Sequence, residues 1–358
     1  MPDPVFIIAE AGVNHNGSLE RAMQLVNAAA DAGANAVKFQ TFQASELVTA
    51  SAAKAAYQVS NTQKSGVQLD MLRDLELSAA DHDCLVRMCR ARRIQFMSTA
   101  FDAGSLALLA TLEMPALKVA SGDITAGQLL LQAARQRRPM IVSTGMATLG
   151  DIEGALGVIA FGLLSNTDPT GSDDFALAYQ SVAGQDALRA TVSLLHCTTQ
   201  YPTPPAAVNL RAMDTMRAAF GLPVGYSDHT LGVEISIAAV ARGATVIEKH
   251  ITLDRTLPGP DHTASLEPEE FARLVRSIRS VEQALGWPLK GPQPDEVANR
   301  VAARRSLVAT RPILRGEIFT AESLAAKRPG IGRSPLEYWD VIGSAASRDY
   351  AQDEAIDG

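Results

Sequence analysis

The sequence predicts a (β/α)8 TIM barrel followed by a small, mostly β domain. Eight short apolar runs alternate with longer helical patterns over residues 1–286, which is the rhythm of an eight-stranded α/β barrel. A segment rich in proline and glycine, 286–294, ends this rhythm, and short strands with turns follow it. We therefore expect a barrel at 1–286, a linker at 287–299 and a second domain at 300–358. A doubly wound parallel sheet is the alternative for the first part.

The first predicted strand covers residues 5–9, and a helix follows it. Ser18 can cap this helix, its apolar positions recur at helical spacing from Leu19 to Ala30, and Gly33 ends it. The same order of a short apolar run and a helical pattern recurs along the chain. The other predicted strands lie at 36–40, 94–99, 116–120, 140–144, 192–196, 223–226 and 245–248.

Two stretches interrupt the alternation. Residues 43–70 are small and polar, and we expect them to form a long loop above the second strand. Residues 165–186 contain turn-forming Asp-Pro and Gly-Ser-Asp-Asp sequences, and we expect an insertion before the sixth strand. The last barrel helix is indicated by apolar residues at helical spacing from Phe271 to Leu285.

Composition excludes some classes of partner. The formal net charge is −7, which argues against nucleic acid or an anionic membrane surface as the main partner. No run approaches the roughly 18 consecutive apolar residues that a membrane helix needs. The three cysteines have no metal-binding spacing and are expected to be small buried residues in a reducing compartment. We therefore expect a cytoplasmic protein.

Polar residues collect where the predicted strands end. In a barrel of this type the carboxyl ends of the strands form the active-site face. A barrel without function would have no use for so many polar groups at one end, since each must be hydrogen-bonded or solvated. The residues at or just beyond these ends are Glu10, Lys38, Gln40, Thr99, Lys118, Ser121, Ser143, Thr144, His196, Ser227, His229, Lys249 and His250.

Two histidines predict a metal site. His229 follows the seventh strand and His250 closes the eighth, so neighbouring strands would bring the two imidazoles together. Two imidazoles without thiolates leave coordination positions for water or substrate oxygens, which suits a Lewis acid that polarises a carbonyl. The alternative is that each histidine is hydrogen-bonded in a structural role.

A second group of residues predicts an anion site. Lys118, Ser121, Ser143 and Ser227 could hold a phosphate or carboxylate, because hydroxyls beside glycine let backbone N–H groups approach an anion. Ordinary turn formation is the alternative for the serines. Lys118 or Lys249 could instead be the Schiff-base nucleophile of a metal-free aldolase.

Several motifs resemble those of the sialic acid synthase family. They occur in the family's order and extend over nearly the whole chain. The last of them resembles the antifreeze-like (SAF) domain with which this family ends. The motifs are IAEAGVNHNG at 8–17, KFQT at 38–41, KVASG at 118–122, STGM at 143–146, HCTTQYP at 196–202, SDHT at 227–230, EKH at 248–250, PGPDH at 258–262 and KRPGIG at 327–332.

The resemblance implies a set of site residues and a domain-swapped homodimer. His229 and His250 would bind Mn²⁺, with Mg²⁺ or Co²⁺ as alternatives, and Arg328 would reach the N-acyl end of the sugar from the partner chain. Thr199 stands where some members have asparagine, which puts its contact with phosphoenolpyruvate in doubt. The implied phosphoenolpyruvate-binding residues are Thr99, Lys118, Ser121, Ser143, Thr199 and Ser227. The implied catalytic and sugar-binding residues are Glu10, Lys38, Gln40, Tyr201 and Asp261.

The implied reaction joins phosphoenolpyruvate to an open-chain N-acylated amino sugar and releases phosphate by C–O cleavage. N-acetylmannosamine is the first expectation for the acceptor, which would make the chain an N-acetylneuraminate synthase. The alternative acceptor is 2,4-diacetamido-2,4,6-trideoxymannose, which gives N,N′-diacetyllegionaminate. A related deoxy-sugar phosphate synthase, a Schiff-base aldolase and a non-enzymatic ice-binding protein are weaker alternatives.

Overall fold

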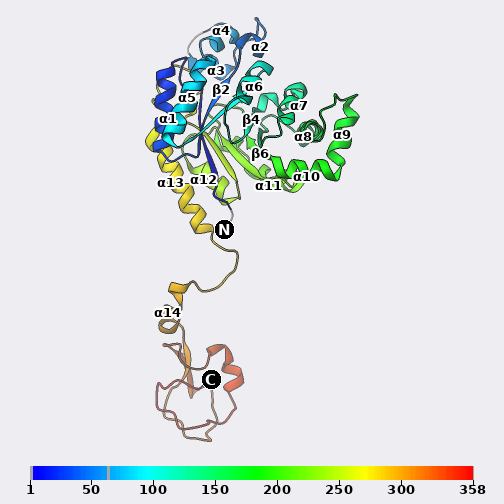
Figure 1. Cartoon of the computed structure of the whole chain (residues 1–358). Coiled ribbons are helices and arrows are strands. Elements are labelled where there is room, and N and C mark those ends of the chain that lie inside the picture. Colours follow the sequence, from blue (N-terminus) through cyan, green and yellow to red (C-terminus); the bar gives the residue numbers. More distant parts are fainter. Residues whose placement is uncertain (1–2, 63–64, 358) are drawn as a thin grey trace. The chain divides into compact units, whose positions relative to one another are not determined.

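The computed structural model describes residues 3–62 and 65–357. The chain divides into two compact units, residues 1–286 and 287–358 (Figure 1). The first is built of strands and helices in alternation, and the second is much smaller.

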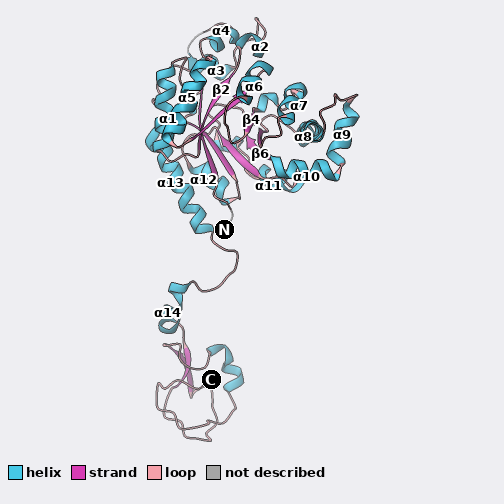
Figure 2. Cartoon of the chain, in the orientation of Figure 1, coloured by secondary structure: helices cyan, strands magenta, loops and turns pink. Residues whose placement is uncertain are grey.

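The first unit is a closed barrel of eight parallel strands in sequence order, surrounded by helices (Figure 2). The sheet closes because β1 pairs with both β2 and β8, so the prediction of a barrel is confirmed and the doubly wound alternative is wrong. The strands are β1 (Phe6–Gly12), β2 (Ala36–Thr41), β3 (Gln95–Ala100), β4 (Leu117–Val119), β5 (Met140–Ser143), β6 (Val192–Cys197), β7 (Val224–Asp228) and β8 (Val246–His250).

Helices connect consecutive strands and pack on the outside of the barrel. The predicted cap of the first is present, since the side chain of Ser18 accepts a hydrogen bond from the Arg21 amide. Buried side chains on the inner faces of these helices form the main apolar core with the outward side chains of the strands. The helices are α1 (Leu19–Asp31), α5 (Ala79–Arg92), α6 (Ala103–Ala110), α7 (Gly127–Arg135), α8 (Leu149–Leu164), α11 (Ala212–Phe220), α12 (Glu234–Ala241) and α13 (Pro268–Leu285).

The two interruptions are partly helical, which corrects the expectation of a long loop at 43–70. That stretch contains α2 (Ala44–Leu47), α3 (Ala56–Thr62) and α4 (Gln68–Arg73). The insertion contains α9 (Ser172–Gln180) and α10 (Val182–Thr191). These short helices have little apolar periodicity, and contacts with distant residues support them, such as the Phe161–Phe175 ring contact between α8 and α9 at 5.5 Å. Short 3-10 helices lie at Ser121–Asp123, Pro205–Ala207, His262–Ala264 and Pro335–Glu337.

The interior of the barrel has an apolar floor. Its buried side chains form a cluster distinct from the core beneath the helices, and one strand after another supplies it: Ile8, Ala36, Met97, Ala116, Ile141, Leu195 and Val246. Side chains alternate along a strand, so the residue two positions later points into the barrel as well. The seventh strand has Gly225 near this level, where a Cβ would lie 2.4 Å from the carbonyl oxygen of Val246. The floor therefore fills the barrel below its carboxyl end.

The second unit has its own apolar cluster around Leu307, Phe319 and Tyr350. It contains α14 (Pro294–Ala303), the antiparallel strands β9 (Ser306–Ala309) and β10 (Leu324–Lys327), and α15 (Tyr338–Val341). Isolated β-bridges extend the pairing, so the expectation of a small, mostly β domain is confirmed. The segment expected to be only a linker is helical from Pro294, because proline suits the first turn of a helix and Gln293 and Glu296 form a capping box.

Among the described residues, no helix is both long enough and apolar enough to cross a membrane.

Candidate active site

Four buried charged residues meet above the apolar floor. Each stands two positions after a floor residue: Glu10 on β1, Lys38 on β2, Lys118 on β4 and Glu248 on β8. The Lys38 ammonium lies 2.6 Å from Glu10 Oε2 and 3.6 Å from Glu248 Oε2, and Lys118 Nζ lies 3.3 Å from Glu248 Oε1. The two lysines therefore compensate the two carboxylates, as buried charges require.

The pKa values of the two carboxylates of this cluster are shifted in opposite directions. Burial acts to raise the pKa of Glu248, but Lys118 and Lys38 outweigh it and hold the pKa at about 2. Burial raises the pKa of Glu10 above its ordinary value, with Lys38 opposing. Glu10 therefore binds a proton more readily than Glu248 does.

Hydroxyls and a glycine lie at or just beyond the carboxyl ends of β4, which carries Lys118, and of the neighbouring β5. Ser143 Oγ, at the end of β5, is buried and has no hydrogen-bond partner among the described residues. The Gly145 amide donates to Ser121 Oγ at 3.0 Å. A Cβ on Gly145 would lie only 2.5 Å from Thr199 Oγ1 and 2.8 Å from Ser121 Oγ. A buried ammonium beside an unpaired hydroxyl and a glycine at close quarters suits a bound anion.

Two more hydroxyls line the same cluster. Lys38 Nζ donates to Thr99 Oγ1 at 3.2 Å, and Ser227 Oγ donates to Glu248 Oε1 at 2.9 Å. Of the residues predicted to hold phosphoenolpyruvate, Thr99, Lys118 and Ser227 thus contact the charged cluster, and Ser121 and Thr199 meet at Gly145. Ser143 lies at the end of β5.

The two predicted metal-binding histidines lie side by side beyond β7 and β8. Their ring centroids are 5.4 Å apart, and both side chains are buried. Burial lowers the pKa of His229 to about 4, and burial together with His229 lowers the pKa of His250. Both imidazoles are therefore neutral near pH 7, which is the form that binds a metal ion.

The hydrogen bonds of these histidines fit a cation ligand. The carbonyl of Thr198 can only accept, so His229 Nδ1 donates to it at 2.7 Å and its Nε2 carries a lone pair. His250 Nδ1 is buried, and no hydrogen-bond partner for it lies in the part of the chain that the structure describes. Within residues 3–62 and 65–357, no three His, Cys, Asp or Glu side chains are grouped to hold a metal. The two imidazoles alone would leave the remaining coordination positions to water or substrate, as the sequence predicts.

Tyr201, Asp261 and Gln40 complete the mouth. The Tyr201 ring lies 4.1 Å from that of His229 and 5.7 Å from that of His250, between centroids. Asp261 Oδ2 lies 3.7 Å from His250 Nδ1, and burial, followed by the nearby Glu10, raises the pKa of Asp261 to about 7. Gln40 Nε2 donates to Glu10 Oε1 at 3.2 Å. Tyr201 and Asp261 thus adjoin the histidines, and Gln40 adjoins Glu10.

Two residues of the mouth have no role in the sequence-based prediction. Glu248 contacts both lysines, and its position two residues after the floor residue Val246 is a signal that could have identified it. Tyr57 on α3 stacks on Tyr201 with centroids 5.1 Å apart. No sequence signal pointed to Tyr57, because α3 was expected to be loop.

Some strand-end residues do not face the mouth. His196 Nε2 hydrogen-bonds the carbonyl of Val208 at 2.6 Å and its ring stacks on Tyr226, on the outer face of the sheet. Lys249 pairs with Asp228, also outside the barrel interior. Arg328 is an exposed residue of the second unit, directly after β10.

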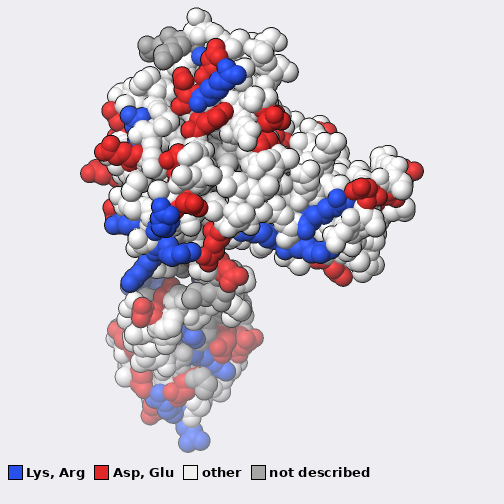
Figure 3. All heavy atoms as spheres, turned by 45° about the horizontal axis from the view of Figure 1, so that its top comes forward, with Lys and Arg blue, Asp and Glu red and all other residues white. Residues whose placement is uncertain are grey.

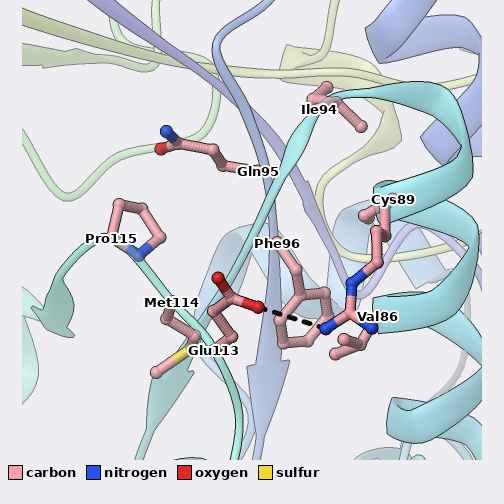
Figure 4. Close-up of a pocket in the computed structure, with 9 residues that line it drawn as sticks. Val86, Cys89, Ile94, Gln95, Phe96, Glu113, Met114 and Pro115 are labelled. Atoms are coloured by element: carbon pink, nitrogen blue, oxygen red, sulfur yellow. Dashed lines mark hydrogen bonds and ion pairs between the residues drawn. The ribbon is translucent and has the colours of Figure 1, made fainter.

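A surface pocket of about 290 Å³ lies at the opposite end of β3 (Figure 4). Gln95 at the start of β3 and Pro115 just before β4 line it, and an exposed Arg90–Glu113 ion pair at 3.1 Å crosses it. None of the predicted site residues lines this pocket, and the amino-terminal end of a barrel is not where such folds place their chemistry. On the face seen in Figure 3, basic and acidic side chains are interspersed.

Comparison with known proteins gives consistent matches. Residues 25–290 match the NeuB family, and residues 304–357 match the SAF domain. The chain is 44% identical to an N,N′-diacetyllegionaminic acid synthase of Campylobacter jejuni, over 98% of each chain. It is also 44% identical to a synthase of the same name from Legionella pneumophila, over 96% of this chain and 90% of that one.

A solved structure of a sialic acid synthetase is also similar to this chain. The N-acetylneuraminic acid (sialic acid) synthetase of Leptospira borgpetersenii is 33% identical to this chain, with a TM-score of 0.67 over 83% of this chain and 90% of that one.

Proposed function

We propose that this enzyme condenses phosphoenolpyruvate with an N-acylated amino sugar and releases phosphate, since the chain belongs to the NeuB family. The observation that carries the proposal is the barrel mouth, where Ser227 links the buried Lys118–Glu248 pair to His229, whose ring lies beside that of His250. This arrangement combines an anion site with groups suited to a carbonyl-polarising cation.

The acceptor we propose is 2,4-diacetamido-2,4,6-trideoxymannose, which gives N,N′-diacetyllegionaminate. Two relatives of 44% identity over nearly the whole chain bear the name of that synthase. They support this acceptor better than N-acetylmannosamine, the first expectation from the sequence.

Lys118, Ser121, Ser143 and Ser227 hold the anionic groups of phosphoenolpyruvate in this proposal, with Thr99 beside Lys38. Burial lowers the pKa of Lys118, so a bound anion would favour its charged form. Thr199 lies against Gly145 and is placed to contact the same ligand, although it replaces the asparagine of some family members.

Two residues of the mouth are suited to the two proton transfers of the proposed reaction. C3 of phosphoenolpyruvate bonds to the aldehyde carbon, whose oxygen gains a proton. Water adds at C2 and loses one proton. The bond between C2 and the phosphate oxygen then breaks as C2 becomes a carbonyl, and the second proton of the water leaves with the phosphate. Asp261, with its pKa near 7, is suited to protonate the sugar oxygen, and Glu10 is suited to accept the proton from water. Gln40 orients Glu10, and Tyr201 covers the histidines.

His229 and His250 would hold the divalent cation, Mn²⁺ in our proposal with Mg²⁺ or Co²⁺ as substitutes. Bound there, it would polarise the aldehyde carbonyl and make its carbon more electrophilic. The proposal also includes a domain-swapped homodimer, in which Arg328 reaches the N-acyl end of the sugar bound to its partner chain.

Phosphate release from phosphoenolpyruvate tests this function. The purified full chain is assayed with each of the two sugars, with Mn²⁺ and with EDTA. We expect turnover with both sugars, a higher kcat/KM for the diacetamido sugar, and loss of activity with EDTA that Mn²⁺ restores. A higher kcat/KM for N-acetylmannosamine would return the acceptor to the first expectation. Covalent trapping of substrate by borohydride would replace this mechanism with a Schiff-base aldolase.

A further inference from the structure

A buried ion pair lies directly behind the two histidines. Asp228 Oδ2 and Lys249 Nζ are 3.0 Å apart, and neither side chain is exposed to solvent. The two residues are opposite each other in the β7–β8 pairing. Each immediately precedes one of the histidines, so the pair joins the two points of the backbone from which the imidazoles arise.

The ion pair faces away from the barrel mouth. Asp228 Oδ2 also accepts a hydrogen bond from Ser236 on α12 at 2.6 Å, which places the carboxylate between sheet and helix. Alternation along β8 sends Glu248 and His250 inward and Lys249 outward. Lys249 is therefore removed from any substrate in the mouth and is unsuited to the Schiff-base role considered for it from the sequence.

The pair also shapes the turn that carries His229. Asp228 Oδ1 accepts hydrogen bonds from the Thr230 amide at 2.8 Å and from Thr230 Oγ1 at 2.7 Å. Lys249 Nζ donates to the Thr230 carbonyl at 2.5 Å. His229 thus lies between Asp228, a member of the ion pair, and Thr230, which hydrogen-bonds to both members, so Lys249 ties β8 to this turn.

The stability of the fold does not by itself explain why a buried ion pair stands at this position. Removing two charges from water costs several kcal/mol for each ion, and a well-packed apolar pair of similar volume is often as stable or more stable. A network of directed hydrogen bonds offers something that an apolar pair cannot, which is a fixed geometry. Here the fixed geometry is that of the segments bearing His229 and His250.

We propose that the Asp228–Lys249 ion pair is a positioning device that sets the two imidazoles at the spacing a divalent cation requires. This inference rests on the proposed function, since it presumes that the histidines bind a cation. The ion pair itself contacts neither substrate nor cation. Its effect is therefore on cation affinity, through the placement of His229 and His250.

Direct Mn²⁺ binding tests the inference without any assay of activity. The full chain is titrated with Mn²⁺, and the free ion is followed by its electron paramagnetic resonance signal. The main variant is the double substitution Asp228→Asn/Lys249→Met, which removes both charges together and leaves no unpaired buried ion. We expect its dissociation constant to rise about tenfold to 100-fold, the usual effect of disturbing groups that orient metal ligands.

Two further variants separate positioning from stability. Leu130→Ala opens the apolar core on α7, on the opposite side of the closed barrel, and should lower the melting temperature without changing Mn²⁺ affinity. Ser236→Ala removes only one hydrogen bond to Asp228 and should raise the dissociation constant about threefold in a fully folded protein. It supplies the measurement if the double variant does not fold.

Three results would overturn the inference, and they differ in what they leave standing. Unchanged affinity in the double variant, or in Ser236→Ala where the double variant does not fold, would remove the ion pair's role and leave the proposed function intact. An equal loss of affinity in Leu130→Ala would show that affinity follows global stability. Mn²⁺ binding by the wild-type chain no better than by His229→Ala would remove the metal site and this inference with it.

Discussion

At the scale of the residue, Asp261 is a carboxyl group of the mouth whose pKa lies near neutral pH. Burial raises its pKa from 3.8 to about 7. The folded protein therefore binds a proton between these values that the unfolded chain has released, so this group lowers stability as the pH rises through that window. His229 acts in the opposite direction, because its pKa falls from 6.5 to about 4.

Asp261→Asn should remove the contribution of Asp261 and leave that of His229. We expect the free energy of unfolding of the metal-free variant, relative to wild type, to increase by roughly 1 to 4 kcal/mol between pH 4 and pH 8. Urea denaturation at a series of pH values measures it. Asp254→Asn is the control, because hydrogen bonds from Thr256 lower the pKa of Asp254 below its ordinary 3.8, so its difference from wild type should stay nearly constant between pH 4 and pH 8. A difference that does not change with pH would contradict a raised pKa for Asp261.

At the scale of the element, the strand–loop boundary decides which polar residues share the mouth. Along six strands the inward side chain changes from apolar to polar in one step of two residues, as from Met97 to Thr99 on β3 and from Ile141 to Ser143 on β5. The loop after β5 then brings Gly145 against Ser121 and Thr199. The proposed anion site thus depends on a close approach between the loops of neighbouring strands.

Gly145→Ala tests this close approach. Its methyl group would lie 2.5 Å from Thr199 Oγ1, so the loop or its neighbours must shift. We expect the KM for phosphoenolpyruvate to rise at least about tenfold, with little change in the KM for the sugar. Steady-state kinetics with each substrate varied in turn measures both. Gly154→Ala in α8 is the matched control, since a Cβ there meets no atom within 4 Å. An unchanged KM for phosphoenolpyruvate in Gly145→Ala would argue against an anion site at this loop.

At the scale of the whole molecule, the chain has two units, each with its own apolar cluster. All the predicted site residues except Arg328 lie in the first unit. The proposed domain swap would make the second unit part of the partner's active site and would bring Arg328 to the sugar bound there.

Mixing two inactive variants distinguishes a swapped arginine from one acting within its own chain. His229→Ala disables the barrel site and Arg328→Ala disables the arginine. After the two proteins are unfolded and refolded together, a swapped dimer should regain about a quarter of wild-type activity, because half the dimers are mixed and each has one complete site. Each variant refolded alone is the control. Activity no higher than the mean of the two controls would mean that Arg328 acts at the sugar site of its own chain or at neither site.

The sequence by itself determined the barrel and most of its mouth, because both depend on local periodicity. Eight apolar runs separated by helical patterns specify the strands, and the polar residues that follow them specify which end carries the chemistry. Motif resemblance then indicated the site residues, and the family match agrees with it.

Only the tertiary structure decided which strand-end residues work together. The sequence placed Lys249 and Glu248 alike at the end of β8, yet alternation turns Glu248 toward Lys38 and Lys118 and turns Lys249 outward to Asp228. The tertiary structure also contains α3, which has too little apolar periodicity to be predicted, and this helix places Tyr57 against Tyr201. Contacts between residues far apart in the chain are set by barrel closure and loop packing, which local sequence patterns do not encode.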